Sequence, residues 1–197
     1  MNASIDVLTL FLFNIVLVNI PLLYGTVGEI VTEKAGSLNL GVEGTMAIGA
    51  IFGYLAGCMA NSLLVGLLVS FLAAGLCGAL FALLTVSLQA NQNVTGLALT
   101  TFGKGVAHFF GVFILDGASY SAAPVANKAF AAKIPVLSGL GTVGQVIFSY
   151  GFLVYAAIVL AVAMHWFLTR TRAGLNLRAV GENPATADAA GINVTLD

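Results

Sequence analysis

Hydrophobic and polar residues follow one another in long blocks along this chain. Five apolar stretches are each close to the roughly 20 residues that a helix needs to cross a bilayer. They cover residues 7–24, 45–60, 62–88, 94–115 and 146–168. The strands of a membrane barrel alternate apolar and polar residues, and these stretches do not. The pattern therefore predicts an all-α polytopic membrane protein with about five transmembrane or re-entrant helices.

The polar stretch at residues 29–44 interrupts this pattern most sharply. It reads EIVTEKAGSLNLGVEG and lies between long stretches that hold no charged residue. In a membrane, such a segment is either an aqueous loop or a broken, partly re-entrant segment that lines a polar pathway. Both interpretations are open, and the second makes Glu29, Glu33, Asn39 and Glu43 candidates for the pathway.

Small residues and one proline mark the apolar stretches. Gly49, Gly53 and Gly57 lie four residues apart, so on a helix they share a face that lets another helix approach closely. Pro21 is expected to kink the first helix or to end it early. A second close-packing patch is predicted at Ala74, Gly75, Gly78 and Ala79.

Lys104 is the unusual residue of the fourth stretch. A lysine near the centre of a span costs at least about 2.5 kcal/mol on insertion scales, so it should face water, a carboxylate or a cavity. Glu29 and Glu33 are the candidate partners. His108 lies four residues later and would share its helical face. Asn91 and Gln92 belong to the polar turn at 89–93 that precedes this helix.

The composition and the absence of catalytic motifs exclude several classes of function. The chain of 197 residues is 59% hydrophobic and 8% charged, whereas soluble domains have roughly 25% charged residues. The net charge of −1 does not indicate a nucleic-acid partner. The sequence contains no P-loop, HExxH or GxSxG pattern. We therefore predict no catalytic residue, metal site or cofactor in this chain.

The basic residues after the last apolar stretch predict the orientation. Arg170, Arg172 and Arg178 assign residues 169–197 to the cytoplasm. Counting back through five crossings places residues 116–145 in an extracytoplasmic loop. Within the tail, Asn183 can cap a helix that begins at Pro184 and stops at Gly191. A helix at 183–191 is too short to be stable alone and suits docking into a groove of another protein.

Three segments of the chain resemble a known family. GEIVTEKAGSLNLGVEG, ANQNVTGLALTTFG and RTRAGLNLRAVGENPATADAAGINV resemble the permease subunits of bacterial ABC importers. The resemblance is to the branch with ribose-type, branched-chain amino acid and nucleoside permeases, and is closest to the simple-sugar/nucleoside group. It extends over residues 21–194, which is nearly the whole chain.

The resemblance implies a multi-pass permease domain in the bacterial cytoplasmic membrane, in contact with lipid. Its partners would be a second permease subunit, cytoplasmic ATPases that bind the ATP, and an extracytoplasmic substrate-binding protein. The solute would be small and polar, with a nucleoside or a simple sugar favoured. The family's ATPase-coupling motif matches Arg178, Gly181, Glu182, Asn183, Pro184, Ala187 and Gly191. Its translocation-path signature matches residues 29–44, and Asn91 and Gln92 match a polar break.

The sequence differs from the family pattern in two ways, and each difference leads to a prediction. Members of the family continue with several more helices after the coupling helix, so residues 1–197 are expected to form an incomplete permease domain. Lys104 stands where a neutral residue is expected. This lysine indicates either an anionic or polar ligand or a side chain that reaches water in a cavity.

Two other functions compete with the permease. An ion-coupled secondary transporter could use Glu29, Glu33 and Glu43, but it leaves the cytoplasmic tail helix unexplained. An intramembrane enzyme would have to use His108 and His165, which belong to no catalytic motif.

Overall fold

The computed structural model describes residues 3–115 and 150–192 of the chain, with side chains described from residue 10 to 112 and from 150 to 192. Every regular element in these residues is helical, so the predicted all-α class is confirmed. The helices are α1 (Ala3–Lys34), α2 (Val42–Ala60), α3 (Leu63–Ala82), η1 (Leu83–Ser87), α4 (Gln92–Leu115), α7 (Phe152–Arg170), α8 (Arg172–Glu182) and α9 (Pro184–Ala189).

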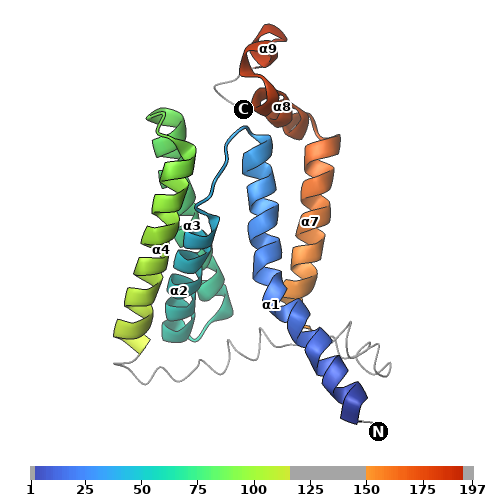
Figure 1. The fold of residues 1–197 in the computed structure, drawn as a ribbon, viewed down its shortest axis with the longest axis vertical. Coiled ribbons are helices and arrows are strands. Elements are labelled where there is room, and N and C mark those ends of the chain that lie inside the picture. Colours follow the sequence, from blue (N-terminus) through green and yellow to red (C-terminus); the bar gives the residue numbers. More distant parts are fainter. Residues whose placement is uncertain (1–2, 116–149, 193–197) are drawn as a thin grey trace.

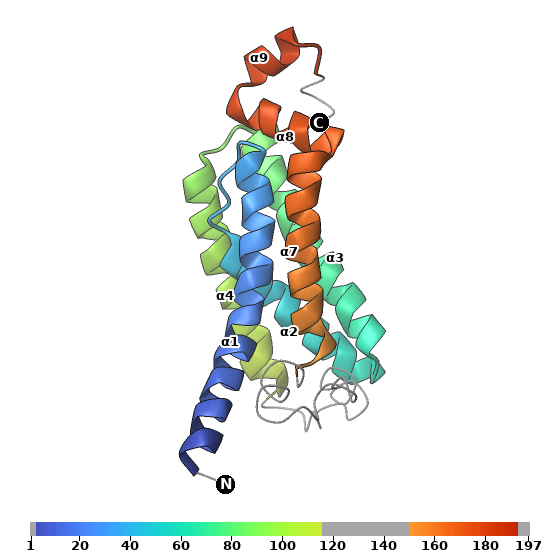
Figure 2. The ribbon, with the colours of Figure 1, turned by 90° about the vertical axis from the view of Figure 1, so that its right-hand side faces the viewer.

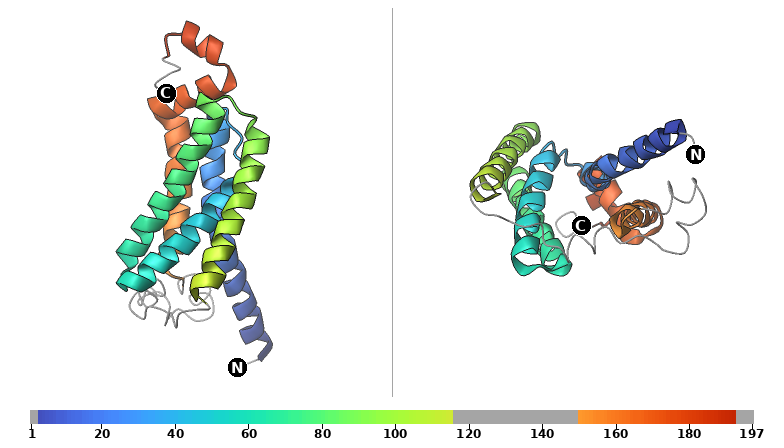
Figure 3. Two further views of the ribbon diagram at one scale, coloured as in Figure 1. Left: turned by 90° about the vertical axis from the view of Figure 1, so that its left-hand side faces the viewer. Right: turned by 90° about the horizontal axis from the view of Figure 1, so that it is seen from below.

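The long helices form two groups that lie side by side. Helices α2, α3 and α4 pack together, and α1 packs on α7 (Figure 1; Figure 3, right). Helix α8 crosses the end of the α1–α7 pair, and α9 projects beyond it (Figure 2). We call this end of the molecule the α8 end. Four segments of the described chain are long and apolar enough to cross a membrane, namely Leu10–Lys34, Val42–Ala60, Leu63–Ser87 and Phe152–Arg170.

Helix α1 is longer than the sequence predicts. It continues without a break through Pro21 to Lys34 and takes in the first residues of the polar stretch. Of the two effects expected of Pro21, a kink or an early end, the early end does not occur. Proline removes one hydrogen bond and displaces the carbonyl four residues before it, and Figure 1 shows α1 bending in its N-terminal half.

The predicted glycine face of the second helix is a packing surface. A β-carbon on Gly53 would lie 2.6 Å from the Ser70 β-carbon, and one on Gly57 would lie 3.5 Å from the Gly66 α-carbon. Helices α2 and α3 therefore approach closely along this face, as small-residue packing allows. The second predicted patch is only partly used. A β-carbon on Gly75 or Gly78 would have no described atom within 4 Å.

Three helices end in the same way. Gly36, Asn61 and Gly191 have positive φ angles of 86°, 45° and 83°. At each, two backbone N–H groups bond back to the last turn, as Ile192 N does to Ala187 O and Gly191 N does to Asp188 O. This is the Schellman pattern, for which glycine and asparagine are favoured because they accept the left-handed conformation. The predicted stop at Gly191 is confirmed.

The predicted helix over 62–88 is not uniform. Its last turn, η1, is a π-helix in which Leu88 N bonds to Leu83 O at 3.0 Å. The buried Thr85 hydroxyl donates to Phe81 O at 2.8 Å. A π-turn carries an extra residue per turn, so it shifts the faces of the last residues relative to α3.

The C-terminal tail holds one more helix than we predicted. Residues 172–182 form α8, which lies between the last apolar helix and the predicted tail helix. The predicted helix at 183–191 is observed as α9 with a shorter helical core. The predicted loop at 116–145 lies outside the described residues.

Candidate functional site

The centre of the candidate site is the non-helical segment at residues 35–41. It connects the end of α1 to the start of α2 and descends alongside the first turns of α4 (Figure 1). Its contacts on α4 run from Gln92 to Thr100, which is about 12 Å along a helix axis at 1.5 Å per residue. Within the polar stretch 29–44, only residues 35–41 are non-helical. They run between α1 and α4 and contact α4.

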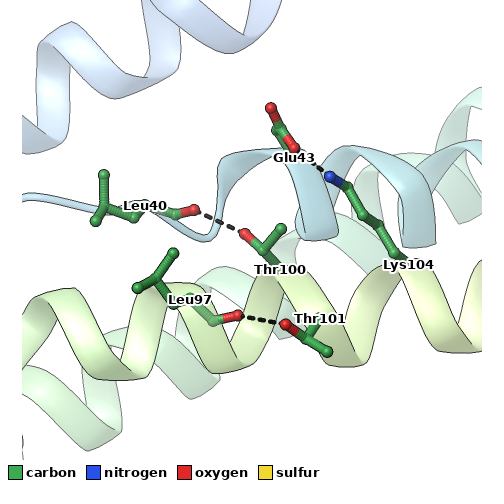
Figure 4. Close-up of polar contacts among 6 residues, drawn as sticks. All are labelled: Leu40, Glu43, Leu97, Thr100, Thr101 and Lys104. Carbon is green, nitrogen blue, oxygen red and sulfur yellow. Dashed lines mark hydrogen bonds and ion pairs between the residues drawn. The ribbon is translucent and has the colours of Figure 1, made fainter.

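Side chains from two helices hold the backbone of this segment. Glu29 Oε1 accepts a hydrogen bond from Asn39 N at 2.8 Å, and Gln92 Oε1 accepts one from Leu38 N at 2.9 Å. Thr100 donates its hydroxyl to Leu40 O at 2.7 Å (Figure 4). Non-helical backbone at membrane depth must have its polar groups satisfied within the protein. These three bonds provide partners for Leu38 N, Asn39 N and Leu40 O.

Two further bonds complete this arrangement. The Thr32 hydroxyl donates to Glu29 Oε2 at 3.0 Å, and Asn39 Oδ1 accepts from Gly41 N at 2.8 Å. Glu29 therefore uses both carboxylate oxygens within the protein. Three of the predicted pathway residues, Glu29, Asn39 and Gln92, meet in this network and act on the backbone of the segment.

Glycines let α4 approach the segment and α2. A β-carbon on Gly96 would lie 2.8 Å from Leu40 N. One on Gly44 would overlap the Leu99 carbonyl oxygen, and one on Gly103 would overlap the Gly44 backbone. Gly96, Thr100 and Gly103 were not predicted from the sequence as residues that position the segment. They lie four and three residues apart and so share one face of a helix, and this spacing could have indicated a close-packed surface.

Lys104 has a carboxylate partner that we did not predict. Its ammonium group pairs with Glu43, at the start of α2, and not with Glu29 or Glu33 (Figure 4). The side chains of Lys104 and Glu43 remain 59% and 67% exposed. The pair therefore presents two opposite charges on an open face of the α2–α4 group.

The tail helices are capped by the residues that precede them. Thr171 accepts a hydrogen bond from Gly174 N at 3.1 Å and caps α8. Asn183 accepts one from Thr186 N at 3.0 Å and caps α9, with Pro184 in the first turn. The predicted cap at Asn183 is confirmed. Glu182, Asn183 and Pro184 are exposed, whereas Ala187 is buried.

The tail touches the polar segment through two glycines. A β-carbon on Gly181 would overlap Lys34 O and lie 2.7 Å from Gly36 N. A β-carbon on Gly36 would lie 3.0 Å from the Gly181 α-carbon. The last turn of α8 therefore rests directly on the turn where α1 ends and the broken segment begins.

The remaining predicted site residues have separate places. Glu33 is exposed at the end of α1. Asn91 is the cap of α4, since its side chain accepts from Val94 N at 3.1 Å. Arg178 is half-buried on α8 and lines a cavity between α1 and α7. His108 and His165 lie on helices of different groups, and no cluster of metal-ligating side chains occurs in the described residues.

A family model fits this chain almost from end to end. The model describes the permease component of the branched-chain amino acid transport system and matches residues 11–196. The chain belongs to this permease family. Members of the family are transport subunits and not enzymes, so the resemblance read from the three motifs is confirmed, as is the assignment to a membrane.

Three curated relatives agree with the family. The nucleoside ABC transporter permease protein NupC of Lactococcus lactis subsp. cremoris is 34% identical over 96% of this chain and 61% of its own length. The putative glucose ABC transporter permease protein TsgC13 of Haloferax volcanii is 34% identical over 88% of the chain and 52% of its own length. The guanosine ABC transporter permease protein NupQ of Bacillus subtilis is 34% identical over 88% of the chain and 56% of its own length.

The permease chain spans little more than half the length of these relatives. No solved structure gives a significant match to it.

Proposed function

We propose that this permease chain forms part of the membrane pathway of an ATP-driven importer for a small polar solute. A nucleoside is the first choice and a simple sugar the second, because the similar proteins carry nucleoside, guanosine and glucose in their names. In this proposal the α8 end faces the cytoplasm, as Arg170, Arg172 and Arg178 favour. Cytoplasmic ATPases, a second permease subunit and an extracytoplasmic binding protein complete the importer.

In this proposal, the contact between Gly181 and Gly36 couples the ATPase to the non-helical segment at residues 35–41. Helix α9, with exposed residues at its start, is the docking element for the ATPase. It follows α8 directly, and the last turn of α8 rests on the end of α1. A displacement of α9 would therefore reach the broken segment at 35–41 through backbone contact, without a flexible side chain between them.

The motif residues have distinct roles in this proposal. Gly181 transmits the displacement, Asn183 and Pro184 start the docking helix, and Ala187 packs its inner face. Glu182 lies exposed beside the cap and would contact the ATPase, and Gly191 ends the helix. Arg178 is half-buried on α8 and lines the cavity between α1 and α7.

The ion pair between Glu43 and Lys104 is the proposed polar contact for the solute. A charged pair facing lipid is unfavourable, so its exposed face belongs to a water-filled path or to another part of the transporter. Paired charges of opposite sign can offer a hydrogen-bond donor and an acceptor to a neutral hydroxyl or amide. Such a surface suits a nucleoside or a sugar better than an apolar solute.

The test of coupling uses the importer assembled with its own subunits. Pro184→Gly and Asn183→Lys should leave the permease in the membrane and reduce the amount of ATPase that co-purifies with it. Glu33→Gln, at an exposed position on α1, is the matched control and should recover ATPase as the unmodified protein does. Equal ATPase recovery from all variants would refute α9 as the docking element.

The test of the solute site exchanges the two charges. Lys104→Glu should lower uptake of radiolabelled nucleosides in cells that carry the complete importer, because two carboxylates then face each other. The double variant Glu43→Lys with Lys104→Glu should restore a large part of that uptake. Unchanged uptake in Lys104→Glu would separate the pair from the solute path.

An ion-coupled transporter is less well supported by the geometry. Glu29 already binds two donors, and Glu43 is paired with Lys104. ATP dependence of uptake in membrane vesicles distinguishes the two mechanisms.

A further inference from the structure

A cavity between α1 and α7 has an uneven distribution of charge. Its volume is about 440 Å³, within the range of 300–1,000 Å³ that is typical of ligand pockets. Leu23, Val27 and Ile30 of α1 face Ala161, Met164 and Leu168 of α7 across it. The walls are thus aliphatic over most of their length.

The basic side chains of the cavity gather at one end. Lys34 closes α1, His165 lies in the last two turns of α7, and Arg178 reaches the cavity from α8. No acidic side chain of the described residues lines this cavity, although Glu33 and Glu182 lie on two of the same helices. Within those residues neither Lys34 nor Arg178 forms an ion pair. The rim therefore presents two positive charges that no ion pair within the described residues neutralises.

The cavity is also elongated along the helices, with its apolar part and its basic end arranged like the acyl chain and head group of a lipid. Its lining on α1 extends from Leu23 to Lys34, about 16 Å along the helix axis. It begins at the α8 end, where the apolar helices end and the basic residues begin. The apolar part would lie at the depth of acyl chains, and the basic rim at the depth of head groups.

From this arrangement we infer that the α1–α7 cavity binds one anionic phospholipid, with its phosphate at Lys34 and Arg178 and an acyl chain between α1 and α7. Basic pockets between membrane helices are suited to anionic head groups, and a guanidinium binds phosphate through two parallel N–H groups. Thr26 and Thr169 also line the cavity, but their hydroxyls donate to carbonyls of their own helices. The two cations are therefore the specific contacts.

A lipid bound in this cavity would also affect the position of α8. Arg178 lies on α8, three residues before Gly181, so a bound phosphate would link the membrane surface to the helix that precedes α9. The lipid would hold α8 against the ends of α1 and α7. The inference does not depend on the identity of the solute.

The experiment measures thermal stability of the permease, purified in mild detergent with the subunits that accompany it and then stripped of lipid. Dioleoylphosphatidylglycerol should raise the Tm by on the order of 5 °C, and dioleoylphosphatidylcholine should raise it much less. In the variant with Lys34→Gln and Arg178→Gln the difference between the two lipids should disappear, since each lost cation weakens binding about fivefold. Arg172→Gln, at an exposed position of α8 outside the cavity, should keep the full difference.

Three results would overturn the inference. They are an equal effect of the two lipids on the unmodified protein, an undiminished difference in the double Gln variant, and stabilisation by inorganic phosphate alone that equals that by phosphatidylglycerol. The last result would mean a site for free phosphate.

A second measurement does not depend on any variant. A photoreactive phosphatidylglycerol added to the unmodified protein should label peptides of α1 and α7. Labelling that avoids both helices would mean that the cavity is filled by polypeptide, and would equally overturn the inference.

Discussion

The two helix groups of this permease differ in how they are packed. Helices α2, α3 and α4 touch through glycines, with backbone against backbone at Gly44, Gly53 and Gly103. The α1–α7 pair instead uses large side chains, such as Tyr24, whose hydroxyl donates a hydrogen bond to Leu153 O at 2.8 Å. Phe13 of α1 also stacks on Tyr150, two residues before α7 begins. The pair also encloses the cavity described above. We therefore expect the first group to have little freedom to shift, and the second to change its spacing at lower cost.

This difference matches the positions of the functional elements. The closely packed group carries the ion pair between Glu43 and Lys104 and one side of the broken segment. The looser pair carries α8 and α9. We therefore expect the α1–α7 pair to move with the tail, while the α2–α4 group, which carries the proposed solute contacts, stays fixed.

The largest expected effect comes from separating the closely packed helices. In Gly44→Val the new side chain would overlap the backbone of α4 at Leu99, which cannot move aside as a side chain can. We expect a loss of roughly 3 kcal/mol or more, seen as a Tm lower by about 10 °C. Gly28→Val on α1 is the control, because a β-carbon there would have no described atom within 4 Å. Equal stability of the two variants would show that the groups do not differ in packing.

The next effect separates the tail from α1. Gly181→Val would push α8 away from Lys34 and Gly36, at a cost of about 1–3 kcal/mol. Because this contact is not part of the packing within either helix group, the solute imported per ATP hydrolysed should fall by a larger fraction than the yield of folded protein. The ratio is measured with the complete importer in proteoliposomes. Ala173→Val, at an exposed position of the same helix, should leave the ratio unchanged, and an unchanged ratio in Gly181→Val would disprove the link.

A smaller effect is expected in the broken segment. Glu29→Ala removes the acceptor for Asn39 N and leaves a backbone donor unpaired, which costs about 1–3 kcal/mol. Limited proteolysis at residues 35–41 should become faster. Glu33→Ala, at an exposed position one turn later in α1, should be cut at the original rate. If both variants are cut alike, the network around Glu29 does not hold the segment.

The smallest effect is confined to α9. Asn183→Ala removes the cap of this short helix and costs about 1 kcal/mol. Amide hydrogen exchange in residues 185–189 should become about fivefold faster, while exchange in α2 and α3 stays the same. Asn183→Ser keeps a capping oxygen and should exchange as the unmodified protein does. Faster exchange in Asn183→Ser as well would assign the effect to something other than the cap.

Local signals account for what could be predicted from the sequence. Blocks of apolar residues mark the long helices, and Asn183 and Gly191 mark the ends of α9 through bonds to residues within one turn. The glycine spacing of α2 marks its close packing with α3. Each of these features depends on residues that are neighbours in the sequence or on one helical face.

The features that were missed depend on distant residues. Helix α8 was not predicted because Gly174 and Gly181 weaken a helix locally. Gly181 is explained by the backbone of Lys34, far away in the sequence, on which it packs, and Gly174 by the backbone of Phe167 in the preceding helix. The partner of Lys104 was missed for the same reason, because Glu43 comes close only when α2 and α4 are packed. The descent of residues 35–41 along α4 is likewise a tertiary feature.

The turn at Gly36 also has a consequence for the order of assembly during synthesis. Its own hydrogen bonds join residues at most five positions apart, so the turn can close as soon as it leaves the ribosome. Its contact with Gly181 needs a residue translated well over a hundred positions later. At about 5–20 residues per second, the end of α1 waits on the order of ten seconds for its neighbour. A turn that keeps its shape unaided would preserve that docking surface until the tail arrives.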